Sequence, residues 1–228
     1  MPNQIINQHI QVIFFDLDGT LVDSSQDIAH ATNHMLQELH LKSVTLEQVQ
    51  HWIGNGSHQL VIRTLAFVTQ VNENQISQQN LAAAMIIFNK HYALCSGLTS
   101  CLYEGVFETL THFKKQNIKM CVITNKPEEF TPRVLKANGI DQFFDLVVSG
   151  DSLATKKPDP AQLFFALDYF DVDKQRVIMV GDSKSDILAA NEAGINSICV
   201  TYGYNHGEDP RLLQATAFVD SFSNITTI

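Results

Sequence analysis

The sequence predicts an α/β protein: a doubly wound parallel sheet with an all-helical segment inserted after the first strand. Three observations lead to this prediction. Short apolar runs recur along the chain, helical patterns separate most of them, and one long stretch near the N-terminus contains helical patterns only. Because parallel strands need helical crossovers, this alternation indicates a sheet covered on both faces. A chain of 228 residues suffices for one large domain or two modest ones.

Four apolar runs are predicted to be buried strands. Each is short, rich in Val, Ile or Phe, and bounded by polar or Gly residues, which is typical of a strand buried on both faces. They lie at residues 11–15, 120–123, 177–180 and 195–200. Two weaker runs follow the same pattern. We expect a fifth strand at 146–148 and an edge strand at 217–219.

Helical patterns fill the intervals between these runs. Residues 104–116 carry apolar side chains at helical spacing. Asp159 followed by Pro160 predicts an N-cap with proline at the first helical position, which opens a helix over 161–169.

The stretch from about Ser24 to Gly97 contains no convincing strand pattern. Ser24 with Asp27, and Thr45 with Gln48, have the spacing of capping boxes at two helix starts. Two further helices are expected over 59–67 and 77–92. This helical stretch is far too long for an ordinary crossover. We therefore expect a helical cap at 23–97, inserted into a core domain made of 1–22 and 98–228.

Charge and cysteine usage exclude several classes of protein. With 15 Lys and Arg against 24 Asp and Glu, the formal net charge is −9, so no general attraction to nucleic acid or an anionic membrane is expected. No cysteine pair has the CxxC spacing of a zinc ribbon or redox motif. The first twelve residues lack Lys and Arg, unlike the start of a signal peptide. We therefore expect a reduced, cytoplasmic protein.

Two predicted strands end in carboxylates. Asp16 and Asp18 follow the first strand, and Asp182 and Asp186 follow the strand at 177–180. Buried strands ending in carboxylates are costly unless a site uses these groups. Ligands of open α/β sheets bind at the carboxyl ends of the strands, near the point where strand order reverses. If the two strands are neighbours there, the four carboxylates converge, and their oxygen atoms suit Mg²⁺.

The same sheet edge is predicted to carry groups that bind phosphate. Thr124, Asn125 and Lys126 follow the strand at 120–123, and Lys157 lies further along the chain. They supply a hydroxyl, an amide and cationic groups, which are donors that phosphoryl oxygens accept from.

These elements resemble the four motifs of the haloacid dehalogenase superfamily, in their order along the chain. The motifs are Asp16-x-Asp18-Gly-Thr, Thr124-Asn125, Lys157-Pro158 and Gly181-Asp182-x-x-x-Asp186. The resemblance covers essentially the whole chain, implies a Rossmann-like core, and places the insert where that superfamily has its helical C1 cap. Residues 52–56, 124–127, 150–160 and 201–205 are further similar to the bacterial phosphoglycolate phosphatase branch.

The resemblance implies Mg²⁺-dependent hydrolysis of a small-molecule phosphomonoester, in this branch 2-phosphoglycolate, through an aspartyl-phosphate on Asp16. Asp18 would act first as general acid and then as general base. Mg²⁺ would be bound by the side chains of Asp16 and Asp182 and by the backbone carbonyl of Asp18. Asp186 would support the metal or orient Lys157.

The resemblance also assigns Thr124, Asn125 and Lys157 to the phosphoryl oxygens. A cap that selects a substrate carboxylate needs a cation or backbone N–H groups. The candidates are Arg63, Gly54, Asn55, Gly56 and Lys126. A structural role in the cap is the competing interpretation for Arg63.

Other functions stay open at this stage. Within the superfamily, the alternatives are a phosphosugar phosphatase or a phosphomutase. A phosphomutase would need more sugar-directed polar and basic groups than this cap offers, and a phosphonatase would need a Schiff-base lysine in the cap. From another class, a non-catalytic binding module would tolerate loss of Asp16, Asp18 or Lys157, yet all three are present. The sequence leaves open whether the protein is a monomer or a homodimer.

Overall fold

The computed structural model describes residues 10–205 and 207–227. Its main feature is a six-stranded sheet with the order β5-β4-β1-β6-β7-β8, in which every neighbouring pair is parallel. The strands are β1 (Val12–Phe15), β4 (Lys119–Ile123), β5 (Leu146–Val148), β6 (Val177–Gly181), β7 (Asn196–Val200) and β8 (Ala217–Val219). The predicted α/β class is confirmed, and each of the six predicted strands is present.

Strand β1 occupies the centre of the sheet. It pairs with β4 on one side and β6 on the other, with Phe15 in register with Val122 and Val180. The chain proceeds outward from β1 through β4 to β5, and then returns to the other side of β1 as β6. Strand order therefore reverses around β1, which is where open α/β sheets form a crevice at the carboxyl ends of their strands.

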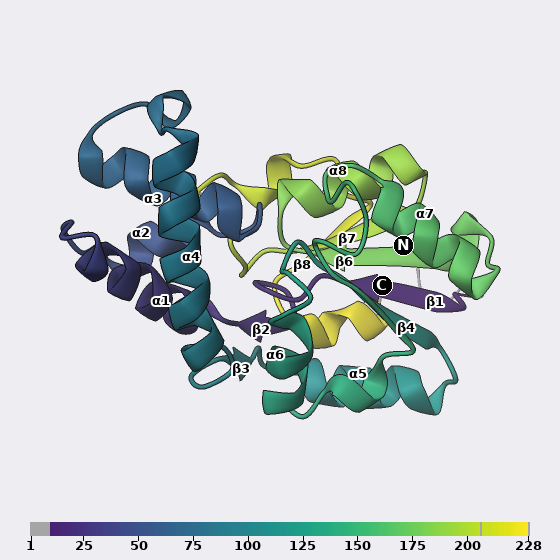
Figure 1. The fold of residues 1–228 in the computed structure, drawn as a ribbon. Helices are drawn as coiled ribbons and strands as arrows, with labels where there is room; N and C mark the ends of the chain where they lie inside the picture. Colours follow the sequence, from purple (N-terminus) through teal and green to yellow (C-terminus); the bar gives the residue numbers. More distant parts are fainter. Residues whose placement is uncertain (1–9, 206, 228) are drawn as a thin grey trace.

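Helices cover both faces of the sheet (Figure 1). Alternate residues of β1 enter two cores: Ile13 and Phe15 join one apolar cluster, and Val12 and Phe14 join the other. The first cluster takes its helical residues from α5 (Val106–Lys115), α6 (Thr131–Ala137) and the 3₁₀ helices η2 (Asp141–Phe143) and η5 (Phe222–Thr227). The second takes them from α7 (Ala161–Phe170) and α8 (Lys184–Ala193).

Four helices lie beside one end of the sheet, around an apolar cluster that is largely their own (Figure 1). They are α1 (Ser25–Glu38), α2 (Leu46–Trp52), α3 (Ser57–Thr69) and α4 (Gln78–Cys95). We call residues 24–100 the helical segment. Shorter 3₁₀ helices occur at η1 (Glu73–Gln75), η2 (Asp141–Phe143), η3 (Lys174–Arg176) and η4 (Pro210–Leu212). None of the described helices has the length and apolar character needed to cross a membrane.

The chain enters and leaves the helical segment through a two-stranded antiparallel ladder. Strand β2 (Val22–Asp23) pairs with β3 (Cys101–Leu102). Two-residue strands leave no periodic pattern in a sequence, so this ladder was not expected. The division into a core and a cap at 23–97 stays a prediction, and the separate apolar cluster supports it.

One of the two predicted capping boxes is present, and the prediction of the other is wrong. Thr45 accepts from the backbone N–H of Gln48, and the Gln48 side chain accepts from the backbone N–H of Thr45. Ser24 occupies the N-cap position of α1, but its hydroxyl makes no cap hydrogen bond. It donates to Asp18 Oδ1 at 2.6 Å instead, because Asp18 lies close enough to compete for it.

The predicted start of α7 shifts by one position. Pro160 takes the N-cap position, and the helix begins at Ala161. Asp159 still helps to start the helix, since its Oδ1 accepts from the backbone N–H of Ala161 at 2.9 Å.

Candidate active site

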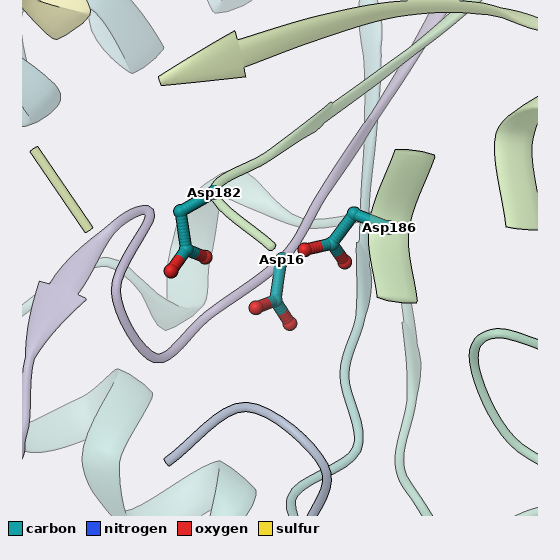
Figure 2. A group of neighbouring side chains, drawn as sticks. All are labelled: Asp16, Asp182 and Asp186. Carbon is teal, nitrogen blue, oxygen red and sulfur yellow. The ribbon is translucent and has the colours of Figure 1, made fainter. Parts of the chain in front are cut away.

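Three buried carboxylates converge at the carboxyl edge of the sheet (Figure 2). Asp16 follows β1, Asp182 follows β6, and Asp186 lies in the first turn of α8. Each offers an oxygen atom within 4.8 Å of the others. The backbone N–H of Asp16 donates to the carbonyl of Val180 at 2.9 Å, which extends the β1–β6 ladder to this point. The pairing of two neighbouring strands thus brings these carboxylates together.

Hydrogen bonds hold Asp182 and Asp186 in place. Asp182 Oδ1 accepts from the Thr20 hydroxyl at 2.8 Å, and its Oδ2 accepts from the backbone N–H of Tyr204 at 2.6 Å. Asp186 Oδ2 accepts from both the backbone N–H and the hydroxyl of Ser183, which caps α8. Asp186 Oδ1 faces the cluster and accepts from Lys157.

Lys157 places its ammonium among these acids. Its Nζ donates to Asp16 Oδ1 at 2.8 Å, to Asp186 Oδ1 at 2.6 Å and to the carbonyl of Ile123 at 2.6 Å. Burial opposes the charge on Lys157, but Asp16 and Asp186 outweigh that effect and raise its pKa above the usual range. Of the two predicted roles of Asp186, these distances support the contact with Lys157.

The cluster holds more negative than positive charge. Burial raises the pKa of Asp16 to about 7, although Lys157 acts in the opposite direction. Burial, together with Asp186 and Asp16, also raises the pKa of Asp182 well above its ordinary range. Three carboxylates face one ammonium, and a hard divalent cation would offset the excess negative charge. The donor set of Asp16, Asp182 and Asp186 therefore fits Mg²⁺.

Asp18 and Asp16 line one small cavity between the sheet edge and the helical segment. Lys126 Nζ donates to both oxygens of Asp18, at 2.9 Å and 3.0 Å, and Ser24 donates to Oδ1.

Thr124 and Asn125 follow β4 and are both buried. The Thr124 hydroxyl accepts from the backbone N–H of Lys126 at 3.2 Å. The Asn125 amide donates to the carbonyls of Lys157 at 2.9 Å and Gly54 at 3.3 Å, so this side chain joins the sheet edge to the helical segment. Asn125 Oδ1 is buried and has no hydrogen-bond partner among the described residues.

A small cavity of about 50 Å³ opens over these groups, between the sheet edge and the helical segment. The core contributes Asp16, Asp18, Thr124, Asn125, Lys126 and Pro127 to its lining. The helical segment contributes Ile28, Ile53, Gly54, Gly56, Ser57, Leu60, Phe88 and Tyr92. The lining is therefore charged on the side of the sheet and mostly apolar on the other.

The specificity candidates divide into two groups. Gly54, Gly56 and Lys126 line this cavity, whereas Asn55 and Arg63 line a neighbouring depression. The Asn55 amide donates to the Ser185 hydroxyl at 2.9 Å.

Arg63 makes contacts within the helical segment. It donates to the carbonyl of Trp52 at 3.1 Å and has its Nε 3.9 Å from Glu73. This placement favours the structural interpretation of Arg63 over contact with a substrate.

Two tyrosines at the site were not predicted. Tyr92 of α4 accepts a hydrogen bond from Lys126, and the loop after β7 brings Tyr204 to the start of α1. The Tyr204 hydroxyl accepts from the backbone N–H groups of Ser24 and Ser25 and donates to Asp23. Nothing in the sequence singles out Tyr92. For Tyr204 the available signal was its loop, which follows a strand on the active-site side.

Comparisons with known proteins agree with this site. A family model described as haloacid dehalogenase-like hydrolase matches residues 13–200. The chain belongs to this family of hydrolases, as the motifs and the confirmed fold class indicate.

Individual relatives in this family are named phosphoglycolate phosphatases. The chain is 42% identical to the phosphoglycolate phosphatase of Colwellia psychrerythraea over 202 residues, which cover 89% of each chain. It is 38% identical to that of Aliivibrio fischeri over 226 residues, which cover 97% of each chain. The crystal structure of a predicted phosphoglycolate phosphatase from Haemophilus somnus 129PT superposes with a TM-score of 0.90 at 33% identity, covering 96% of this chain and 97% of the other.

Proposed function

We propose that this protein is a Mg²⁺-dependent phosphatase that hydrolyses 2-phosphoglycolate to glycolate and phosphate. The observation that carries the proposal is the acidic cluster of Asp16, Asp182 and Asp186 around Lys157, beside a small cavity whose lining includes the Lys126 side chain. The relatives named above support the choice of substrate.

In this proposal Asp16 is the nucleophile. Lys157 occupies its Oδ1, and Oδ2 accepts no hydrogen bond from the described residues, so Oδ2 is available to attack phosphorus. The new bond joins this oxygen to phosphorus while the bond from phosphorus to the glycolate oxygen breaks, which leaves an aspartyl-phosphate. When bound, Mg²⁺ would offset the repulsion between the Asp16 carboxylate and the anionic phosphoryl group.

Asp18 would serve both halves of the reaction. Protonated, it gives its proton to the leaving alkoxide; as the resulting carboxylate, it accepts a proton from the water that attacks the aspartyl-phosphate. That attack breaks the bond between phosphorus and Asp16, releases phosphate and restores the free nucleophile. Lys157, the Thr124 hydroxyl and the backbone of Asn125 would bind the phosphoryl oxygens and stabilise the charge that spreads over them.

The cavity lining supports a small substrate with a carboxylate. A sugar phosphate would bring several hydroxyl groups against Ile28, Ile53, Leu60 and Phe88, which offer no hydrogen-bonding side-chain atoms. Lys126 places one positive charge in the lining, and the loop carrying Gly54 and Gly56 can approach a ligand closely with its backbone.

The test is kcat/KM for phosphate release from 2-phosphoglycolate, several sugar phosphates, nucleoside monophosphates and an aryl phosphate. Each is measured with Mg²⁺ and with EDTA. We expect 2-phosphoglycolate to lead by tenfold or more, about 1.4 kcal/mol of transition-state discrimination, and EDTA to abolish turnover. Asp16→Asn should be inactive, whereas Asp220→Asn, at an exposed ion pair with Arg211, should retain full activity.

Two results would contradict the proposal in different ways. A sugar phosphate as the best substrate would refute the choice of substrate and leave the roles of the carboxylates intact. No turnover of any ester with Mg²⁺ present would refute the catalytic roles themselves, and a binding function would then be the better account.

A further inference from the structure

A hydrogen-bonded pair links the sheet edge to the helical segment inside the cavity. Lys126, from the loop after β4, and Tyr92, from α4, are 5% and 3% exposed. Lys126 Nζ donates to Tyr92 Oη at 2.5 Å and to both oxygens of Asp18. An ammonium group has three hydrogens to donate, so these contacts use the full capacity of Lys126.

The Tyr92 hydroxyl has a hydrogen that is not used. Its oxygen accepts from Lys126, and no acceptor for its own hydrogen occurs among the described residues. Burial raises the pKa of Tyr92, so the phenol keeps this hydrogen at neutral pH. Because the residue lines the cavity, a bound ligand can accept from it.

Packing holds the Tyr92 ring without help from its hydroxyl. The ring stacks on Phe88 with centroids 5.5 Å apart and meets Phe130 edge to face at 4.7 Å. Phe130 precedes α6, and the contact therefore crosses from the helical segment to the core. The hydroxyl is thus placed by apolar contacts, and a phenylalanine at this position would keep those contacts.

The pair matches the chemistry of a carboxylate. Lys126 supplies a positive charge and the Tyr92 hydroxyl supplies one free donor, so a carboxylate beside them can pair with the ammonium and accept a hydrogen bond from the phenol. Among the lining residues of the helical segment, Ser57 and Tyr92 carry a side-chain donor, whereas Ile28, Leu60 and Phe88 carry none. An anionic group extending from the phosphate site toward α4 would therefore meet Lys126 and Tyr92.

We propose that Tyr92 is a specificity-determining residue, which donates its hydroxyl hydrogen to the substrate carboxylate that Lys126 neutralises. This inference rests on the proposed function and deepens it. Tyr92 and Lys126 come from opposite sides of the cavity, so the carboxylate is bound only while the helical segment lies against the sheet edge.

The experiment compares two esters that differ at one end only, 2-phosphoglycolate and 2-hydroxyethyl phosphate, in the wild type and in Tyr92→Phe. A hydrogen bond to a charged group corresponds to roughly tenfold to a hundredfold in binding. We expect kcat/KM of Tyr92→Phe to fall by about that factor for 2-phosphoglycolate, with little change for 2-hydroxyethyl phosphate. The matched control is Tyr169→Phe, at an exposed tyrosine of α7, which should behave as the wild type with both esters.

The outcomes separate this inference from the proposed function. Equal losses with both esters would mean that the hydroxyl has a structural role. No loss with 2-phosphoglycolate would mean that the hydroxyl does not contact the substrate. Either result would overturn this inference and leave the proposed function intact. A wild type that does not prefer 2-phosphoglycolate to 2-hydroxyethyl phosphate would overturn both.

A double-mutant cycle gives a second, independent measurement. If Tyr92 and Lys126 bind the same carboxylate, Tyr92→Phe should cost much less in a Lys126→Met background than in the wild type, since the carboxylate is then already poorly held. Additive losses would overturn the inference. Melting temperatures of the variants check that each is folded.

Discussion

Lys157 is surrounded by groups that would be left unsatisfied without it. Its ammonium contacts Asp16, Asp186 and the carbonyl of Ile123, and only 1% of its side chain is exposed. Removing one partner of a buried ion pair leaves an uncompensated charge, which costs more than the pair itself contributes. The same contacts that serve the proposed chemistry therefore also stabilise the fold.

The first prediction concerns this lysine. Lys157→Met should lower the free energy of unfolding by about 3 kcal/mol and abolish phosphatase activity. Urea unfolding followed by circular dichroism measures the first effect. Lys119→Met provides the control, because Lys119 pairs with Asp145 at the same 2.8 Å distance but is exposed. Similar losses for both variants would contradict the special position of Lys157.

The second prediction concerns pH in the metal-free protein. The pKa of Asp16 is about 7 in the folded state, against about 4 for an unfolded carboxyl. Between these values the folded state retains a proton that the unfolded state has lost, so stability falls as pH rises from about 4 to about 7. The Asp16→Asn variant has no carboxyl group at this position, so it lacks this pH-dependent change in stability. In EDTA, the melting temperature of this variant minus that of the wild type should therefore be larger at pH 8 than at pH 4.5. A difference that does not change with pH would contradict the raised pKa.

Asp27 anchors the start of helix α1, which is a different role from the one that its sequence spacing predicted. Asp27 was expected to complete a capping box with Ser24. It is instead buried, and it accepts from the backbone N–H groups of Gly97, Thr99 and Ser100 and from the Thr99 hydroxyl. The start of α1 is thereby tied to the segment where the chain returns from α4.

The third prediction tests this anchor. Asp27→Ala leaves several backbone donors without an acceptor, so it should lower the free energy of unfolding by at least about 2 kcal/mol. Thr45→Ala, which removes the exposed capping box of α2, should cost about 1 kcal/mol. Chemical denaturation of the two variants side by side gives the comparison. A smaller loss for Asp27→Ala than for Thr45→Ala would contradict the anchoring role.

The elements were predictable to the extent that their pattern is local. Buried strands such as β4 and β6 have continuous apolar runs, and their bounds differ from the expected ones by one residue. The Thr45 capping box depends on residues three positions apart. The predicted capping box at Ser24 was wrong because the turn after β1 brings Asp18 close, and the Ser24 hydroxyl donates to Asp18 instead.

For the whole molecule, the sequence predicted that the carboxylates converge if the two strands that precede them are neighbours, and the strand order places β1 beside β6. The pairing of Lys126 with Tyr92 did not, since it depends on how the helical segment lies on the sheet. Such contacts join distant parts of the chain and leave no spacing pattern. The predicted residues that line the cavity accordingly lie mostly on the sheet edge, and the helical segment adds Gly54 and Gly56 to them.

The fourth prediction is a response of the whole protein to Mg²⁺. A ligand that binds only the folded state stabilises it by about 2.7 kcal/mol at a hundred times its Kd. The melting temperature should therefore rise when Mg²⁺ is added and fall back to its metal-free value when EDTA removes the ion. Asp182→Asn should lose most of this shift, and Asp145→Asn, remote from the cluster, should keep it. An unchanged melting temperature of the wild type at saturating Mg²⁺ would contradict the metal site.

The β2–β3 ladder has a consequence for how such proteins diversify. The chain leaves the core at Asp23 and returns at Cys101, and these two residues are paired. An excursion that begins and ends at one place can be lengthened, shortened or replaced without moving any strand of the sheet, because closing a longer loop costs only slightly more entropy. A helical segment of another length could thus join the sheet at the same place, while the carboxylates at the ends of β1 and β6 keep their positions.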